Sequence, residues 1–383
     1  MLKQKTHREI PDQPELDKLL FVIPLVLTLC GLLMIASITP DLAVSHRYHA
    51  FYYPIRQLIY IVLSCFLSIV VFKLIPLKFW FQINFVLFIG TLFLLILLFV
   101  PGIGVRVNGA LRWLDLGFMR FQPSELLKLA MLTYLAGYLS KQTDWIKYNR
   151  LPLEPLVMFA IAACLLILEP DFTPIIILFV LVMSLLFIGG LAWRWLLAFL
   201  CLGLSSLLVL VYYAPYRLKR FATVIDPWSK QFDEGYQITQ ALLAIGRGGW
   251  FGKGIGKSVQ KSFYLPEAHT DFLFAILVEE LGVIVGLLMI LCFMLLVARI
   301  MLVAIRAKQL SMMFTHYLVF GIAVLIGVQT VVNLGVNLGL LPTTGIPLPF
   351  LSYGGSHLLI TAILVGICLR ADYETKSVQS ESV

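Results

Sequence analysis

Long apolar runs dominate the chain, and most polar residues fall between these runs. A spanning helix needs about 20 apolar residues, because the hydrocarbon layer is about 30 Å thick and a helix rises about 1.5 Å per residue. The chain is therefore expected to be an all-α integral membrane protein of about ten transmembrane helices, with a large extracytoplasmic loop, residues 215–270, between the seventh and eighth. The expected spans are residues 19–38, 55–75, 79–101, 123–140, 154–169, 173–190, 193–214, 271–298, 314–337 and 347–369.

The composition supports a membrane location. Of the 383 residues, 60% are hydrophobic and 13% are charged, whereas soluble domains are about half apolar and about a quarter charged. The polar segment 1–18 precedes a full-length span rather than a short apolar segment with a cleavage site, so we expect no cleavable signal peptide. The predicted organisation is one polytopic domain, residues 19–370, with cytoplasmic tails at residues 1–18 and 371–383.

The distribution of lysine and arginine predicts the orientation. The N-terminal tail and alternate short loops are basic, for example at Lys73, Lys78 and Arg194, and basic short loops face the cytoplasm. Both termini are therefore expected to be cytoplasmic. The same bias and contacts with lipid phosphates explain the net charge of +8, so we expect membrane lipids and no nucleic acid as partners. Two extracytoplasmic segments, residues 102–122 and 215–270, are basic against this rule.

The six cysteines all fall in apolar segments, with no CxxC motif and no histidine at ligand spacing. This pattern predicts small core residues rather than disulfides or metal ligands. They are Cys30, Cys65, Cys164, Cys201, Cys292 and Cys368.

Segment 102–122 carries Arg112 and Arg120, and Glu125 and Lys128 follow one helical turn apart. These residues suit either an i,i+3 ion pair with lipid-headgroup contacts or a basic pocket for a polyanion. The turn "LEPDFTPI" places Asp171 at the same expected level, either as a helix cap or as an acid facing the same cavity.

The large loop contains "YQITQALLAIGRGG", whose apolar spacing predicts a short helix at the membrane surface that ends at glycines. The following "GRGGWFGKGIG" lacks the GK[ST] ending of a Walker motif. It is either a flexible turn or a loop whose amides approach an anion. Arg217, Arg247 and Lys261 are basic residues in or beside these stretches.

"YLPEAHTDFLFAILVEELG" sets Glu267, His269 and Asp271 at the extracytoplasmic end of the eighth expected span. Asp271 suits either a helix N-cap or a reacting carboxylate. Glu279 and Glu280 lie deeper and are expected to pair with lysine or backbone groups inside the bundle. "LPTTGIPLPFLSYGGSHLLI" is rich in proline, glycine and hydroxyls, and it predicts a re-entrant or broken helix that lines a cavity.

Several stretches, in order from about residue 100 to the tail, together resemble the SEDS family (shape, elongation, division and sporulation). They include "NGALRWLDLG", "RFQPSELLKL", "EPDFTP", "YLPEAHTDFLFAILVEELG" and "PTTGIPLPFLSYGGS". "GYQITQALLAIGRGG" and the tail "LRADYET" favour the cell-division branch over the elongation branch. "EPDFTP" departs from the usual family pattern at Glu169 and Thr173.

The resemblance implies a glycosyltransferase that polymerises lipid II outside the bacterial cytoplasmic membrane and releases undecaprenyl pyrophosphate. Because this outcome inverts the anomeric carbon, a single displacement with one base suffices. The resemblance implies Asp271 as that base, and as a ligand of a divalent cation, Mg²⁺. The substrate-binding residues that we expect are Arg112, Arg120, Glu125, Lys128, Asp171, Arg217, Arg247, Lys261, Glu267, His269 and Ser352.

The resemblance also implies a class B penicillin-binding protein as partner, an FtsI-like transpeptidase, together with other divisome proteins at the division septum. Three alternatives stay open from the sequence. They are a lipid II flippase, a polymerase of the elongation type, and a scaffold that only recruits a transpeptidase.

Overall fold

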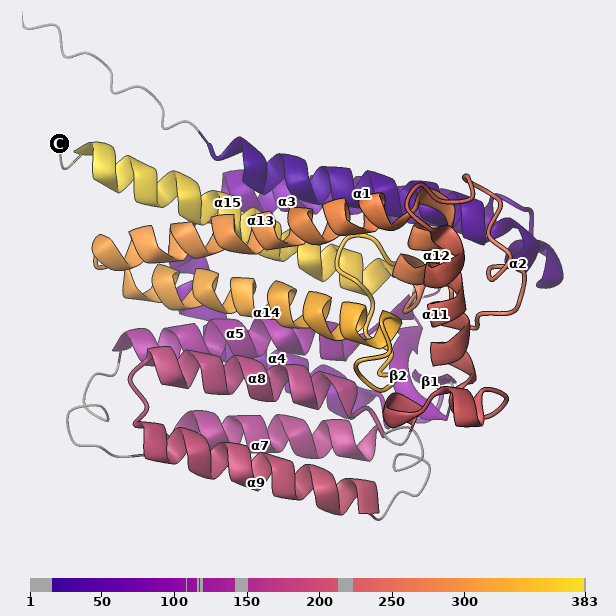
Figure 1. The fold of residues 1–383 in the computed structure, drawn as a ribbon. Coiled ribbons are helices and arrows are strands. Elements are labelled where there is room, and N and C mark those ends of the chain that lie inside the picture. Colours follow the sequence, from indigo (N-terminus) through magenta and orange to yellow (C-terminus); the bar gives the residue numbers. More distant parts are fainter. Residues whose placement is uncertain are drawn as a thin grey trace, which may run out of the picture.

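The computed structural model describes residues 16–107, 109–115, 117, 120–141, 151–212 and 223–381. Long helices lie side by side, and the strands and short helices gather at one end (Figure 1). The long helices are α1 (Lys18–Ile38), α3 (Tyr52–Leu74), α4 (Leu77–Leu97), α5 (Pro123–Lys141), α7 (Leu153–Leu168), α8 (Thr173–Ile188), α9 (Trp193–Tyr212), α13 (Val283–Gln309), α14 (Met313–Asn337) and α15 (Gly355–Glu381). The shorter elements are α2 (Pro40–Ser45), the 3₁₀ turn η1 (Trp228–Lys230), α11 (Tyr236–Gly248), α12 (Leu273–Leu281), β1 (Gly104–Val107), β2 (Ala110–Asp115) and β3 (Arg120–Phe121).

Six of the described helices, α1, α3, α4, α13, α14 and α15, are long and apolar enough to cross a membrane. Helices α7 and α8 and the first part of α9 are apolar but shorter, and α5 carries the buried charges of Glu125 and Lys128. The prediction of a helical, multi-pass membrane protein is confirmed, and the count of ten spans stays a prediction.

The core lies where α5, α8 and α14 pack together. Helix α5 is buried on nearly all sides, and α14 contacts α13, α5 and α8 along its length. Because α5 has neighbours all around, its two charged residues are enclosed by protein rather than by lipid, which is where such residues are tolerated.

The eighth expected span is not one helix, and the prediction of a continuous helix over residues 271–298 is wrong. It is divided at Gly282, whose φ of 91° lies in the left-handed region that glycine adopts without strain. The stretch before the break is α12, and α13 follows it.

The glycine-rich loop packs against this break by its backbone. A Cβ on Gly248 would lie 2.1 Å from the Val278 carbonyl oxygen, and one on Gly252 would lie 2.2 Å from that of Glu280. The amides of Lys253 and Gly254 donate to the carbonyls of Glu279 and Glu280 at 3.0 and 2.9 Å. These two amides serve the end of α12 and do not cradle an anion.

Two further differences lie at the ends of elements. The prediction of an all-α chain missed the antiparallel sheet β1-β2-β3 in segment 102–122. Residues 338–354 form a loop, so the last helix begins at Gly355 rather than at residue 347. That helix continues to Glu381 instead of ending at residue 369, and the described part of the expected tail, residues 371–381, is helical.

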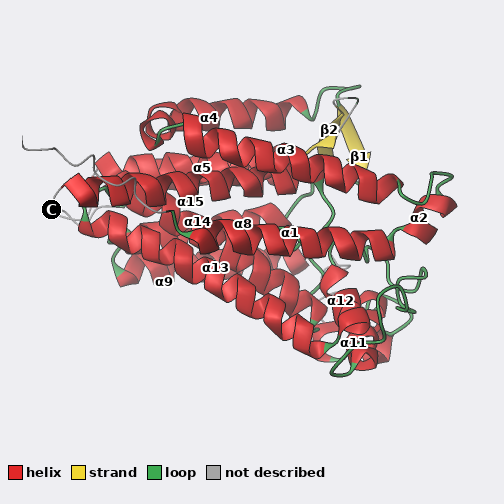
Figure 2. Ribbon diagram, turned by 90° about the horizontal axis from the view of Figure 1, so that it is seen from above, coloured by secondary structure: helices red, strands yellow, loops and turns green. Residues whose placement is uncertain are grey.

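Both described chain ends lie at one end of the bundle. The buried Asp372 carboxylate accepts from Arg306 at 2.7 Å, from Lys376 at 2.8 Å and from the Asp17 amide at 2.9 Å. The sheet, α2, α11 and α12 lie at the opposite end (Figures 1 and 2). This arrangement agrees with two termini on the same side of a membrane.

Candidate active site

A cavity of about 570 Å³ lies at the end of the bundle that carries the sheet. The β1–β2 hairpin, the loop before α12, the loop after α14 and the first turn of α15 all contribute residues to it. Its charged or ionisable lining residues are Arg112, Glu267, Asp271, Tyr353 and His357. The stretch "LPTTGIPLPFLSYGGSHLLI" thus lines a cavity as predicted, as a loop followed by a helix.

The backbone of Asp271 is fixed by two asparagines of α14. The Asp271 carbonyl accepts hydrogen bonds from the side-chain amides of Asn333 at 2.8 Å and Asn337 at 2.9 Å. Its amide donates to the Glu267 carbonyl at 3.1 Å. These contacts hold the main chain, while the carboxylate lines the cavity. No side-chain cap is formed at α12, whose N-cap residue is Phe272, so the helix-cap reading of Asp271 is wrong.

Ser352 and His269 support the loop that carries Asp271. The Ser352 hydroxyl donates to the Thr270 carbonyl at 2.5 Å and accepts from the Leu348 amide at 2.8 Å. The His269 ring packs against two tyrosine rings, with centroids 5.9 Å from Tyr53 and 5.7 Å from Tyr353. Neither residue belongs to the cavity lining, so their contribution in the structure is to hold the loop.

Asp271 precedes α12, and its environment changes its acidity. Burial raises the pKa of Asp271 to about 7, with a smaller increase from the Glu267 charge and a decrease from Arg112. A carboxyl group with a pKa near the working pH is populated as a base and can also hold a proton. Burial lowers the pKa of His269, and the Glu267 charge opposes this decrease.

Arg112 lies at the cavity wall and pairs with Asp171, with 3.3 Å between the guanidinium and the carboxylate. Asp171 is therefore an ion-pair partner rather than the cap of α8, whose N-cap residue is Phe172. Burial raises the pKa of Glu169 to about 8, and the Asp171 charge adds to that rise. The turn thus places two acids beside one arginine.

Glu125 and Lys128 form the predicted i,i+3 ion pair at 2.7 Å, but both side chains are buried in the bundle rather than at a lipid surface. The Nδ1 atom of His357 lies 3.0 Å from Glu125 Oε2, the same oxygen that Lys128 contacts at 2.7 Å. Sequence reasoning did not select His357. The available signal was its place in "YGGSH", directly after the loop that was expected to line a cavity.

The predicted pairing of the two deeper glutamates is confirmed. The Glu280 carboxylate accepts from Lys261 at 3.1 Å and from the Ser37 hydroxyl at 2.7 Å. Glu279 accepts from the Val259 amide at 3.2 Å and from the Ser258 hydroxyl. Lys261 therefore belongs to this cluster and to a separate cavity beside α1 and α2, not to the cavity of Asp271.

Two of the other basic residues that we selected do not line the cavity of Asp271. Arg120 and Arg247 are exposed, and neither belongs to the lining. Arg217 lies outside the described residues.

The described residues contain no group of three or more histidine, cysteine, aspartate or glutamate side chains that could hold a metal. Asp271 and Glu267 both line the cavity, however. Mg²⁺ is commonly held by one or two carboxylates together with substrate phosphates and water. These two acids therefore fit a cation that would share its coordination with a bound phosphate.

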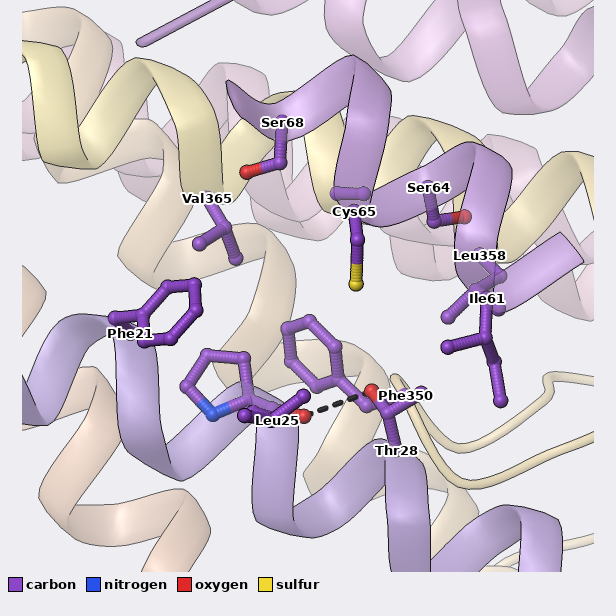
Figure 3. A pocket seen from close by; sticks show the side chains of 12 residues that line it. Phe21, Leu25, Thr28, Ile61, Ser64, Cys65, Ser68, Phe350, Leu358 and Val365 are labelled. Carbon is purple, nitrogen blue, oxygen red and sulfur yellow. Dashed lines mark hydrogen bonds between the residues drawn. The ribbon is translucent and has the colours of Figure 1, made fainter. Parts of the chain in front are cut away.

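An apolar cavity lies between α1, α3 and α15, and the side chains that line it include Phe21, Ile61, Cys65 and Phe350 (Figure 3). All six cysteines are free, as predicted. Their expected place in the core is wrong for Cys65, Cys164 and Cys201, which are exposed. An apolar helix surface that faces lipid accepts a small thiol as readily as a core does.

The fold and the cavity of Asp271 define a multi-pass helical membrane protein with ionisable groups gathered at one end of its bundle. Residues 17–377 match the FtsW, RodA and SpoVE family, described as cell cycle proteins, and the chain belongs to that family.

Curated relatives and solved structures agree with this membership. The chain is 43% identical over 364 residues to the probable peptidoglycan glycosyltransferase FtsW of Nitrosococcus halophilus, which covers 95% of this chain and 94% of the relative. The protein of the same name from Coxiella burnetii is also 43% identical, over 94% and 97% of the two chains.

Among solved structures, a chain from a peptidoglycan synthase complex that coordinates polymerization and crosslinking is similar, with a TM-score of 0.74 and 29% identity over 94% and 98% of the two chains. The rod shape determining protein RodA of Thermus thermophilus is similar with a TM-score of 0.67 and 30% identity, over 93% and 96% of the two chains.

Proposed function

We propose that this protein is a peptidoglycan glycosyltransferase that polymerises lipid II into β-1,4 glycan strands during septal cell-wall synthesis. The observation that carries the proposal is the cavity in which Asp271, with a pKa raised to about 7, lies beside Arg112. It is supported by relatives named peptidoglycan glycosyltransferase FtsW that are 43% identical over nearly the whole chain.

In the proposed reaction, the 4-hydroxyl of the acceptor GlcNAc attacks the anomeric carbon of the lipid-linked donor strand. The new glycosidic bond forms as the bond from that carbon to pyrophosphate breaks on the opposite face, which inverts the configuration. The acceptor proton passes to the Asp271 carboxylate, and the electron pair of the broken bond leaves with undecaprenyl pyrophosphate. Burial supports this role, because a carboxylate with a raised pKa is a stronger base.

Arg112 offsets the charge that develops on the departing pyrophosphate, and Asp171 holds its guanidinium at the cavity wall. Glu267 and Asp271 would hold a Mg²⁺ ion, which when bound supplies further positive charge to the phosphate oxygens. The described side chains thus provide a base and a fixed cation in one cavity.

The test is polymerisation of labelled lipid II by the purified full-length protein in detergent. We expect long glycan from the wild type, none from Asp271→Asn and little from Asp271→Glu. Asp41→Asn, which changes an exposed acid outside this cavity, should retain full activity. Polymer from Asp271→Asn at the wild-type rate would contradict the role of this residue.

The same assay tests two accompanying proposals. Detergent removes the two compartments between which a flippase would work, so a lipid II flippase would leave the monomer unconverted. EDTA should lower the polymerisation rate and added Mg²⁺ should restore it, and a rate that EDTA leaves unchanged would exclude the cation.

We further propose that the protein works in the bacterial cytoplasmic (inner) membrane at the division septum, with both termini in the cytoplasm. A class B penicillin-binding protein, the FtsI-like transpeptidase, would be its partner, together with other divisome proteins. The similarity to a chain of a synthase complex that coordinates polymerization and crosslinking supports a crosslinking partner. A fluorescent fusion should concentrate at mid-cell, and uniform signal along the side wall would favour the elongation branch instead.

A further inference from the structure

Three buried polar atoms without hydrogen-bond partners belong to residues that line the cavity of Asp271. They are Nε2 of His357, Oγ1 of Thr344 and Nε of Arg112, each unpartnered within the described structure. Leaving such an atom unsatisfied is energetically costly, so buried polar groups without partners are uncommon in native proteins. Three of them around one cavity indicate a ligand that completes their hydrogen bonds.

The orientation of the His357 ring is set by α5. Its Nδ1 atom lies 3.0 Å from Glu125 Oε2, and the Glu125 carboxylate is itself held by Lys128 at 2.7 Å. An ionised carboxylate only accepts hydrogen bonds, so Nδ1 carries the proton in this contact. His357 is 5% exposed, and with Nδ1 engaged its unpartnered Nε2 is the ring atom available to a ligand.

The position of His357 in its helix favours a negatively charged ligand. It lies in the first turn of α15, and Gly354, just before that helix, also lines the cavity. Helix N-termini carry a partial positive charge and unpaired amide donors, which attract anions. The Arg112 guanidinium adds a full positive charge, and the Thr344 hydroxyl can donate as well.

We propose that His357, Thr344 and Arg112 form a phosphate subsite in this cavity, and that His357 donates its Nε2–H to a phosphate oxygen. This inference rests on the proposed function, because the phosphate would belong to the pyrophosphate of a lipid-linked sugar. In this arrangement Nδ1–H donates to the Glu125 carboxylate and Nε2–H donates to the phosphate oxygen. Asp271 remains the base for the acceptor hydroxyl.

Lys128 contributes to the phosphate subsite indirectly. Lys128 does not line the cavity, whereas His357 does, and the two are linked through Glu125. Lys128 is therefore a positioning residue, which orients Glu125 so that Glu125 can orient the His357 ring.

The test uses inorganic pyrophosphate as the probe on the purified full-length protein. Its inhibition constant in lipid II polymerisation and its effect on the melting temperature are measured for wild type, His357→Leu and Thr344→Val. Loss of a hydrogen bond to a charged group costs about 1.5–3 kcal/mol. We therefore expect pyrophosphate to bind about tenfold more weakly or worse in each variant, and to raise the melting temperature less.

Matched controls come from α14. His316 and Thr330 are buried, bonded to the backbone carbonyls of Ala304 and Ile326, and absent from this cavity. His316→Leu and Thr330→Val should bind pyrophosphate as the wild type does, after melting without ligand has shown that each variant folds. His357→Lys, which returns a hydrogen-bond donor, should recover part of the lost affinity.

The possible outcomes separate this inference from the proposed function. If the wild type polymerised lipid II, but both cavity variants bound pyrophosphate as strongly as the wild type, the subsite would be overturned and the proposed function would remain. If the wild type made no polymer, but both cavity variants bound pyrophosphate more weakly than the wild type, the subsite would be supported and the proposed function would be overturned.

Discussion

At the scale of single residues, the acidity of Asp271 connects the structure with a measurable rate. Since burial raises its pKa to about 7, the basic form is scarce in acid and dominant in alkali. We expect the polymerisation rate to rise about tenfold per pH unit below about pH 7 and to level off above about pH 8. Initial rates in detergent across this range would measure the profile, and a rate that does not change with pH would contradict the prediction.

Rising pH is expected to change stability and activity in opposite directions at Asp271: activity increases, whereas the contribution of this residue to stability decreases. The folded-state pKa of Asp271 lies above its ordinary value of 3.8, so folding favours the protonated carboxyl. This residue therefore lowers stability progressively as the pH rises from about 4 to about 7. Any gain in the melting temperature of Asp271→Asn over the wild type should accordingly be larger at neutral pH than in acid. A variant that melts no lower than the wild type has not lost its activity through unfolding.

At this scale, the sequence indicated part of the cavity lining. Arg112, Glu267 and Asp271 all line the cavity as expected, because charged residues beside long apolar runs are conspicuous. His357 was missed because its partner, Glu125, lies 232 residues away in the chain. Lys261 was placed with the substrate, but its buried partner Glu280 turns it toward another cluster.

At the scale of elements, the break between α12 and α13 depends on Gly282. Its φ is 91°, and an added Cβ would lie 2.3 Å from the Trp250 carbonyl oxygen. Gly282→Ala should therefore lower the free energy of unfolding by about 1–3 kcal/mol or more, through backbone strain and the steric clash. Thermal unfolding in detergent measures the change.

Gly246→Ala is the matched control, since an added Cβ on this residue of α11 meets nothing within 4 Å. In a helix, alanine is favoured over glycine by about 1 kcal/mol, so this variant should be as stable as the wild type or more so. If Gly282→Ala melted at or above the temperature of Gly246→Ala, the left-handed break would not be required.

Apolar runs predicted most helices, because the length of a run reports the length that must be buried in lipid. They could not reveal the break, since one glycine within an apolar run looks like any other small residue. The sheet was missed because its strands are short and depend on pairing between β1, β2 and β3. The extended part of α15 contains Asp372, whose ion pair with Arg306 joins residues 66 positions apart and appears only after folding.

At the scale of the whole molecule, the cavity and the chain ends lie at opposite ends of the bundle. With both termini in the cytoplasm, Trp250 beside α11 should face outward and Ser311 between α13 and α14 should face inward. In a variant without the native cysteines, a membrane-impermeant thiol reagent added to intact spheroplasts should label Trp250→Cys and spare Ser311→Cys. Lysed membranes should allow both to react, and the reverse pattern in spheroplasts would invert the proposed orientation.

The backbone contact between the glycine-rich loop and α12 has a mechanical consequence. Gly248 at the end of α11 and Gly252 touch the carbonyls of Val278 and Glu280 with no side chain between them. Flexible side chains can absorb a small displacement by changing rotamer, whereas two peptide backbones in direct contact cannot. A displacement of α11 by an outside contact would therefore displace α12 as well. Through α12 it would shift the Asp271 carboxylate, two residues before that helix begins.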